Sequence, residues 1–364
     1  MIEKAYKKAL ETIDLCSQKQ GLYASGGKKG YRGVWARDSI ISLIGAITED
    51  KKDYKEIFKR SLLTLGEKQS KRGQIPNAVH GFEDKKLKVD YISIDSSLWF
   101  IIGHYIYKEK YGNSLFKKEN KKIKKALTWI EYRDFGEEGL PDQLPTTDWQ
   151  DAFPHKYGEV INTQALYYKI LKLMKNKKAN KIRKIVNQDK EHGLWNGNYY
   201  WAYRWKNHNK YKEIGEWFDS LGNLLAIIFD LADKKQSEKI ITYIKKNKIN
   251  KPFPVKAIWP PIKKGSKYWE DYFLDCDAGK PFHYLNGGIW PFIGGFYVLA
   301  LIKMKKFKEA KKELQLLAES NTKNNPFPEW INPLDKKTHG VYQAWSAGLY
   351  ILAYNSLKKK KVLI

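Results

Sequence analysis

Residues 287–320 read GGIWPFIGGFYVLALIKMKKFKEAKKELQLLAES and contain two helical patterns in close succession. Apolar side chains recur every three or four residues over 287–303 and again over 306–320, which is the spacing of one face of an α-helix. Only residues 304–305 separate the two patterns, and so short a connection places consecutive helices antiparallel and side by side. This stretch therefore predicts a helical hairpin with a long connection on either side of it.

The same alternation of long and short connections extends along the whole chain. Helical periodicity predicts twelve helices, at 3–19, 38–48, 53–70, 96–111, 115–131, 159–174, 178–190, 217–232, 235–246, 287–303, 306–320 and 341–357. Short turns near 49–52, 112–114, 175–177, 233–234 and 304–305 alternate with long connections at 20–37, 71–95, 132–158, 191–216, 247–286 and 321–340.

Alternate connections of an up-and-down helical array emerge at the same end, so all the long connections are expected at one end. Twelve helices in six hairpins can close into an all-α (α/α)6 barrel with a pocket at that end. A solenoid of hairpins is the competing architecture, but the chain shows no fixed-period repeat. We expect one catalytic domain over 1–357, a basic tail over 358–364, and at most short extended pieces such as Asn198–Trp205 within the loops.

The composition narrows the classes of function. Lys+Arg number 67 against 40 Asp+Glu, a net charge of +27 over 364 residues, yet the lysines are spread along the chain rather than gathered in one block. A lysine-rich surface explains this spread better than a nucleic-acid interface does. No apolar run reaches the roughly 20 residues of a membrane span, and 1–14 lacks the apolar core of a signal peptide, so we expect a cytoplasmic protein. Cys16 and Cys276 are expected to remain free thiols.

Tryptophans and acidic residues occur together in the predicted long loops. Aromatic faces pack against the C–H faces of sugar rings, while carboxylates and amides hydrogen-bond sugar hydroxyls. The chain has none of the glycine-rich phosphate motifs, and its seven histidines show no metal-ligand spacing, so we expect neither a metal nor an organic cofactor. Carboxylates in such a pocket indicate glycoside hydrolysis, in which one acid protonates the leaving oxygen and a second carboxylate activates water or attacks.

Nine stretches carry a family resemblance. In the first half they are WARDSIISL at 35–43, GQIPN at 73–77, DSSLWF at 95–100, WQDA at 149–152 and EVINTQAL at 159–166. These resemble signatures of the glucosidase part of glycogen debranching enzymes. Later come DSLGN at 219–223, YLNGGIWP at 284–291, PEW at 328–330 and QAWS at 343–346, which are similar to segments of neutral/alkaline invertases.

The resemblance implies an (α/α)6 barrel and an inverting mechanism, with Asp95 as general acid and Glu329 as general base. It also implies that Arg37 and Asp38 bind hydroxyls of the terminal sugar. Further substrate contacts are expected from Trp35, Asp151, Glu159, His283, Asn286, Trp290, Gln343 and Trp345.

The predicted function is therefore exo-acting hydrolysis of an α-glucosidic bond in an oligosaccharide, of the amylo-α-1,6-glucosidase type. Sucrose cleavage, as in neutral/alkaline invertases, is the alternative within the enzyme class. Outside that class, the same barrel can serve as a glycan-binding or basic interaction protein without catalysis. An enzyme requires both carboxylates of its pair, whereas a binding protein tolerates the loss of either.

Overall fold

The computed structural model describes residues 1–27, 30–83, 86–189, 191–207 and 211–364. Within them lie twelve α-helices and two short 3-10 helices. The α-helices are α1 (Ile2–Cys16), α2 (Ala36–Ala46), α3 (Lys52–Glu67), α4 (Ile94–Tyr111), α5 (Ser114–Glu131), α6 (Ile161–Leu173), α7 (Lys178–Gln188), α8 (Ser220–Ile228), α9 (Lys234–Lys246), α10 (Pro291–Lys303), α11 (Phe307–Ser320) and α12 (Ala344–Lys358); the 3-10 helices are η1 (Asp271–Asp275) and η2 (Asp277–Gly279).

Helix boundaries follow local chemistry and differ from the predicted ones by a few residues. Helix α10 begins at Pro291 rather than at 287, because Gly287 adopts a left-handed φ of 87° and Ile289 bridges to Ile331 as extended backbone. Proline suits the first helical turn, since the amide that it lacks has no partner there. Helix α9 begins in a capping box formed by Asp233 and Gln236.

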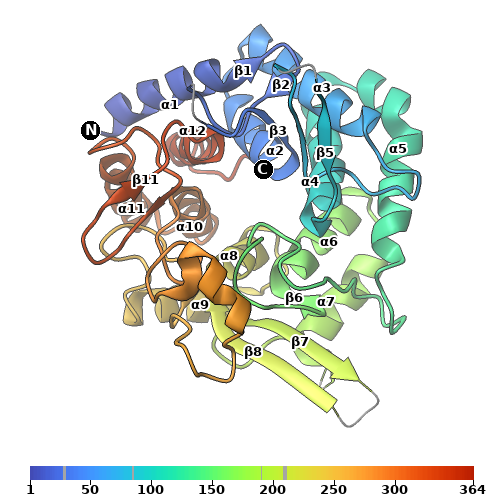
Figure 1. Ribbon diagram of the computed structural model, residues 1–364, viewed down its shortest axis with the longest axis vertical. Coiled ribbons are helices and arrows are strands. Elements are labelled where there is room, and N and C mark those ends of the chain that lie inside the picture. The colour runs from blue at the N-terminus through green and yellow to red at the C-terminus, as the bar shows by residue number, and fades with distance from the viewer. Residues whose placement is uncertain (28–29, 84–85, 190, 208–210) are drawn as a thin grey trace.

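The even-numbered helices form a closed inner ring. Each contacts the next, from α2 through α4, α6, α8 and α10 to α12, and α12 returns to α2. The helices α1, α3, α5, α7 and α11 pack against this ring from outside, as Figure 1 shows. Apolar residues dominate the inner helices, which are buried on nearly all sides, so the ring is the core of the molecule.

The expectation of an all-α chain is wrong for the connections, which contain short antiparallel sheets. Three-residue strands β3 (Gly33–Trp35), β4 (Ala78–His80) and β5 (Lys88–Asp90) form one sheet, and β6 (Glu159–Val160), β7 (Trp201–Asn207), β8 (Tyr211–Asp219) and β9 (Ile258–Trp259) form another, in that order. Two-stranded pairs complete the set: β1 (Ser17–Gln18) with β2 (Gly21–Leu22), and β10 (Trp330–Ile331) with β11 (Thr338–His339).

The β7–β8 hairpin replaces part of a predicted helix. A helix was expected to start at 217, but Trp217, Phe218 and Asp219 instead end β8, and Asp219 caps α8 through a bond from the Gly222 amide. The apolar pair Trp217–Phe218 shortly before the apolar run of α8 made this stretch resemble the start of the helix. The extended conformation expected at Asn198–Trp205 is confirmed, although the strand β7 runs from Trp201 to Asn207.

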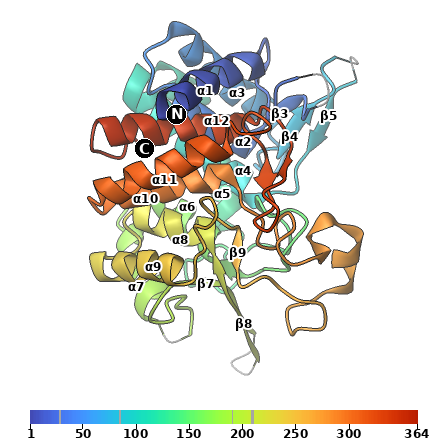
Figure 2. The ribbon, with the colours of Figure 1, turned by 90° about the vertical axis from the view of Figure 1, so that its left-hand side faces the viewer.

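The strands β3, β4 and β5 lie together at one end of the helical ring. Figure 2 shows β3, β4 and β5 on the side opposite the C-terminus, whereas β8 extends from the lower part of the molecule. The segment after α12 is packed against the molecule, since Val362, Leu363 and Ile364 contact the core. None of the described helices has both the length and the apolar character required to cross a bilayer.

Candidate active site

A cavity lies where several inner helices begin. Its walls come from connections far apart in sequence, and they carry aromatic, acidic and amide side chains. The lining residues are Ala24, Tyr31, Trp35, Arg37, Asp38, Trp149, Asp151, Tyr284, Trp290, Glu329, Gln343 and Trp345.

Three helix starts supply much of this lining. Trp35 ends β3 in an extended conformation, and α2 then begins at once, so that Arg37 and Asp38 lie in its first turn. Gln343 likewise precedes α12 in extended conformation, and Trp290 precedes α10. Each helix start thus presents polar or aromatic side chains at the same end of the ring.

Arg37 organises the acidic side of the cavity. Its side chain is 3% exposed, and its two terminal nitrogens reach different carboxylates: Nη1 lies 3.2 Å from Asp95 Oδ1, and Nη2 lies 3.2 Å from Asp151 Oδ2. Nη1 also donates to Asn77 Oδ1 at 2.9 Å and to Ser93 Oγ at 3.0 Å. The planar guanidinium can make these contacts simultaneously, which an ammonium cannot.

Asp95 does not occupy the place expected of a general acid. It is 1% exposed, it is not among the cavity-lining residues, and it pairs with Arg37 and accepts a hydrogen bond from the Ser93 hydroxyl. Burial is the largest influence on its pKa, which is raised despite the opposing charge of Arg37. A buried aspartate that pairs with Arg37 and does not line the cavity can position the guanidinium, whereas a proton donor must reach the leaving oxygen.

Asp151 faces the cavity instead. Its side chain is 37% exposed and lines the cavity while it holds Arg37. Enclosure by the cavity walls raises the pKa of Asp151, and the Arg37 charge opposes this rise. Asp151 was expected only to contact substrate, but its accessibility makes it the better candidate for proton transfer.

Glu329 lies on the same cavity, directly before β10. Its amide donates to the carbonyl of His339 at 2.8 Å, and the Tyr31 hydroxyl donates to its Oε1 at 3.4 Å. Burial and, to a smaller extent, the charges of Asp38 and Asp151 together raise the pKa of Glu329 to about 7, against the lowering effect of the Tyr31 hydrogen bond. Burial likewise raises the pKa of Asp38 to about 6, against the lowering effect of Arg37.

Aromatic rings form the rest of the wall. Trp345 stacks on Phe292 at 4.2 Å between centroids, and Trp149 and Trp290 meet edge to face at 5.4 Å. The indole N–H groups of Trp35, Trp149 and Trp345 are buried without a hydrogen-bond partner among the described residues. Buried donors without a partner are uncommon, so these groups are available to a ligand with hydroxyls.

Three expected substrate contacts lie elsewhere. Asn286 is fully buried, where it donates to the Ile262 and Ala278 carbonyls and accepts from the Ile262 amide, so it fixes a loop. Glu159 is bonded to His192 and does not line the cavity. His283 packs near Trp330 at 5.6 Å and is also outside the lining.

Sequence reasoning missed Tyr31 and Tyr284 as lining residues. Tyr31 stands in none of the quoted stretches, whereas Tyr284 begins the YLNGGIWP stretch but was not nominated as a substrate contact. Trp149 lay within a quoted motif, and its position close to two acidic residues was the available signal.

A buried charge cluster fixes the segment that carries Asp151. Lys156 Nζ lies 2.8 Å from Asp148 Oδ2 and 2.8 Å from Asp219 Oδ2, and it donates to Gln150 Oε1 at 2.5 Å. The side chains of Lys156, Asp148 and Asp219 are all 0% exposed. This cluster ties residues 148–156 to the start of α8 and so holds the backbone on both sides of Asp151.

The fold is shared with solved glycoside hydrolases. The mannosylglycerate hydrolase of family GH63 from Thermus thermophilus, solved with Tris and D-glycerate, is 13% identical with a TM-score of 0.67 over 95% of this chain and 99% of that one. A bacterial glucoamylase solved with acarbose is 16% identical with a TM-score of 0.62 over 99% of this chain and 56% of that one. The chain is thus built on the helical barrel of glycoside hydrolases.

The sequence match points to one family within that class. Residues 212–360 match the family model described as alkaline and neutral invertase. Alkaline/neutral invertase C, mitochondrial, from Arabidopsis thaliana is 30% identical over 142 residues, which is 37% of this chain and 21% of that protein. The matched part thus corresponds to about a fifth of the plant relative. The resemblance to helical-barrel glycoside hydrolases is confirmed.

Proposed function

We propose that the protein is an inverting, exo-acting glycoside hydrolase on an (α/α)6 barrel, with Asp151 as general acid and Glu329 as general base. The observation that carries the proposal is the pair of carboxylates on one aromatic cavity, each with a raised pKa. The closed ring of inner helices and the shared fold support the barrel. Asp95, expected as the acid, becomes a positioning residue for Arg37.

The two carboxylates have the surroundings that their roles need. A general acid must hold a proton near neutral pH, and enclosure of Asp151 favours its protonated form. The base must be ionised, and Glu329 has a pKa of about 7, so it is half ionised at neutral pH and becomes fully ionised as the pH rises further. Asp151 gives its proton to the leaving oxygen, while Glu329 takes a proton from the water that attacks the anomeric carbon.

Inversion at the anomeric carbon requires space for one water molecule between that carbon and the carboxylate of Glu329. Inverting enzymes keep their carboxyl groups roughly 6.5–9.5 Å apart for this water, whereas retaining enzymes hold them about 5 Å apart. Arg37 forms ion pairs with Asp95 and Asp151, and among the described residues Glu329 has no ion pair with it. The Tyr31 hydroxyl, the hydrogen-bond partner of Glu329, also lines the cavity and can orient the attacking water.

The substrate is a small glucoside bound by its non-reducing end. Asp38 and Gln343 offer hydrogen bonds to hydroxyls, and the indoles of Trp35 and Trp345 offer both a ring face and an unpaired N–H. The match to alkaline and neutral invertases favours sucrose over a branched α-1,6 oligosaccharide. The α-1,6 bond remains the second candidate, on the strength of the WARDSIISL stretch that supplies Arg37 and Asp38.

A panel assay tests the proposal. The purified protein is incubated with sucrose, isomaltose, maltose and a branched maltooligosaccharide, and released glucose is measured. We expect release from sucrose or isomaltose, and we expect Glu329→Gln to abolish it while sugar binding persists. Asp335→Asn, in the exposed turn between β10 and β11, is the matched control and should retain activity. Unchanged glucose release by Glu329→Gln would contradict the proposed activity. Sugar binding by the unmodified protein without any glucose release would also contradict it.

A further inference from the structure

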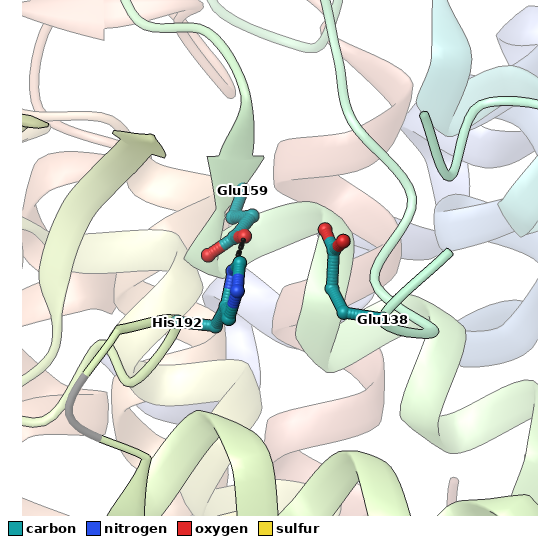
Figure 3. Close-up of side chains that lie close together, drawn as sticks. All are labelled: Glu138, Glu159 and His192. Carbon is teal, nitrogen blue, oxygen red and sulfur yellow. Dashed lines mark hydrogen bonds and ion pairs between the residues drawn. The ribbon is translucent and has the colours of Figure 1, made fainter. Parts of the chain in front are cut away.

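A second group of polar side chains lies outside the proposed active site. Glu138 comes from the connection after α5, Glu159 from β6, and His192 from the connection after α7. Figure 3 shows the polar ends of all three side chains side by side, although they belong to three separate segments. None of them lines the cavity that holds Asp151 and Glu329.

The geometry of this group is that of a partly formed ligand set. One potential ligand atom from each residue lies within 4.8 Å of the other two. Glu159 Oε1 lies 2.5 Å from His192 Nδ1, and this hydrogen-bonded pair must lose the proton between the two atoms and move apart before both can bind one ion. Ligands about 2.1 Å from a zinc ion lie roughly 3.4 Å apart, so small side-chain rotations suffice to close the set.

A buried carboxylate oxygen in the group has no hydrogen-bond donor among the described residues. The Glu159 side chain is 5% exposed, and its Oε2 can pair with the neighbouring Glu138 carboxylate only through a proton or a cation. Figure 3 places this carboxylate beside that of Glu138. An unsatisfied buried carboxylate oxygen costs free energy unless a proton or a cation occupies the space beside it.

Charged residues surround the group. Asp142 lies close enough to interact electrostatically with both Glu138 and Glu159. Arg204, on the strand next to β6, donates from its Nη1 to the Gly193 carbonyl at 2.9 Å.

We propose that Glu138, Glu159 and His192 bind a divalent first-row transition metal, with Zn²⁺ as the preferred ion. One imidazole with two carboxylates suits zinc, whereas Mg²⁺ and Ca²⁺ take oxygen ligands alone. Glu138 and His192 are partly exposed, so the ion enters from solvent. The ion is structural: it fastens three connections at the end of the ring where Asp151 lies, and it does not touch the substrate.

Calorimetric titration with metal tests this site. The full-length protein is stripped with chelator, dialysed and titrated with ZnCl2, MnCl2, CaCl2 and MgCl2, and its unfolding temperature is measured with and without each ion. We expect one Zn²⁺ per chain and a rise in unfolding temperature of roughly 3–6 °C at a zinc concentration a hundred times Kd. Glu138→Gln should weaken zinc binding at least about tenfold and remove most of that rise.

The matched control is Glu137→Gln, which removes the charge of an exposed neighbouring glutamate outside the group. It should bind zinc as the unmodified protein does. His192→Ala provides a second ligand variant and should also lose the site. Zinc binding that survives both ligand variants, or no stoichiometric binding at all, would overturn the proposal. Binding of Ca²⁺ or Mg²⁺ in preference to Zn²⁺ would overturn the assigned metal class.

Discussion

Replacing Lys156 by methionine would leave Asp148 and Asp219 without their shared cation. All three side chains are 0% exposed, and Lys156 Nζ lies 2.8 Å from each aspartate. Burial alone would lower the pKa of Lys156, but the two carboxylates outweigh it and raise the pKa above its usual value. A raised lysine pKa means that its stabilising effect is complete below about pH 10 and is lost only as the solution becomes more alkaline.

The magnitude follows from the burial of both partners. Removing one member of a buried ion pair costs about 3–5 kcal/mol, because the remaining charge is left uncompensated in the interior. Since Lys156 neutralises two carboxylates, we expect the loss in free energy of unfolding at pH 7 to lie at the upper end of that range, about 5 kcal/mol. Urea denaturation followed by far-UV circular dichroism measures this loss.

A matched control separates this effect from the loss of any lysine. Lys178→Met breaks a pair with Glu131 that spans 3.6 Å between side chains 64% and 38% exposed. Exposed pairs contribute less than about 1 kcal/mol, so this variant should unfold almost as the unmodified protein does. A loss of under about 1 kcal/mol for Lys156→Met would refute the argument that the cluster fixes the segment carrying Asp151.

Three further predictions concern the proposed active site. Asp151→Asn should reduce hydrolysis of glucosides with poor leaving groups by about 10²–10⁴-fold and spare activated aryl glucosides, as measured by kcat/KM on both classes. Asp38→Asn removes a negative charge that raises the pKa of Glu329, so the rise of kcat/KM with pH near 7 should move to lower pH. Arg37→Lys should raise KM, because one ammonium cannot replace the fork that holds Asp95 and Asp151.

Each of these has an outcome that contradicts it. Asp95→Asn is the control for the acid: it should lower activity equally for both leaving-group classes, and rescue by activated substrates in this variant alone would restore Asp95 as the proton donor. For Asp38→Asn, a pH profile of kcat/KM whose ascending limb stays in place or moves to higher pH would show that the charge of Asp38 does not raise the pKa of Glu329. An unchanged KM in Arg37→Lys would show that Arg37 does not position the substrate.

The helices were predictable from sequence because each has its own apolar periodicity. The helices expected at 306–320 and 115–131 match α11 and α5 within a residue, since their apolar stripes are clear and polar turns bound them. Only part of the β7–β8 hairpin was predicted, because the pairing of its two strands leaves no periodic pattern in the sequence of either strand. Short sheets such as β3–β4–β5 join segments far apart in sequence for the same reason.

Sequence identified several residues of the candidate site but not how they are arranged. Arg37, Asp38, Glu329 and Trp345 were nominated from motifs, and all of them line the cavity. Sequence could not show that Asp95 pairs with Arg37 and is absent from the cavity lining, because one turn of helix decides whether a side chain faces a cavity or a neighbour. Asn286 was misassigned for a similar reason: an amide that satisfies three backbone groups and one that binds a sugar look alike in sequence.

The buried polar groups were the least predictable feature. Lys156 has two aspartate partners, and they lie before it at 148 and far beyond it at 219 in the chain. The Glu138, Glu159 and His192 group was likewise not predicted, because its three members have no regular spacing in the sequence. Such groups form only when separate connections meet, so a single sequence contains no local signal for them.

The anomeric configuration of the first product tests the central claim most directly. Proton NMR is recorded within the first minutes after the protein is mixed with sucrose or isomaltose, before mutarotation equalises the anomers. If Asp151 and Glu329 act as the acid and base of an inverting hydrolase, the attacked glucosyl unit leaves as β-glucose, so β-glucose at first exceeds its equilibrium share. An initial excess of α-glucose from isomaltose would contradict the account, because retention at the attacked carbon requires a covalent intermediate and a carboxylate that attacks the sugar itself.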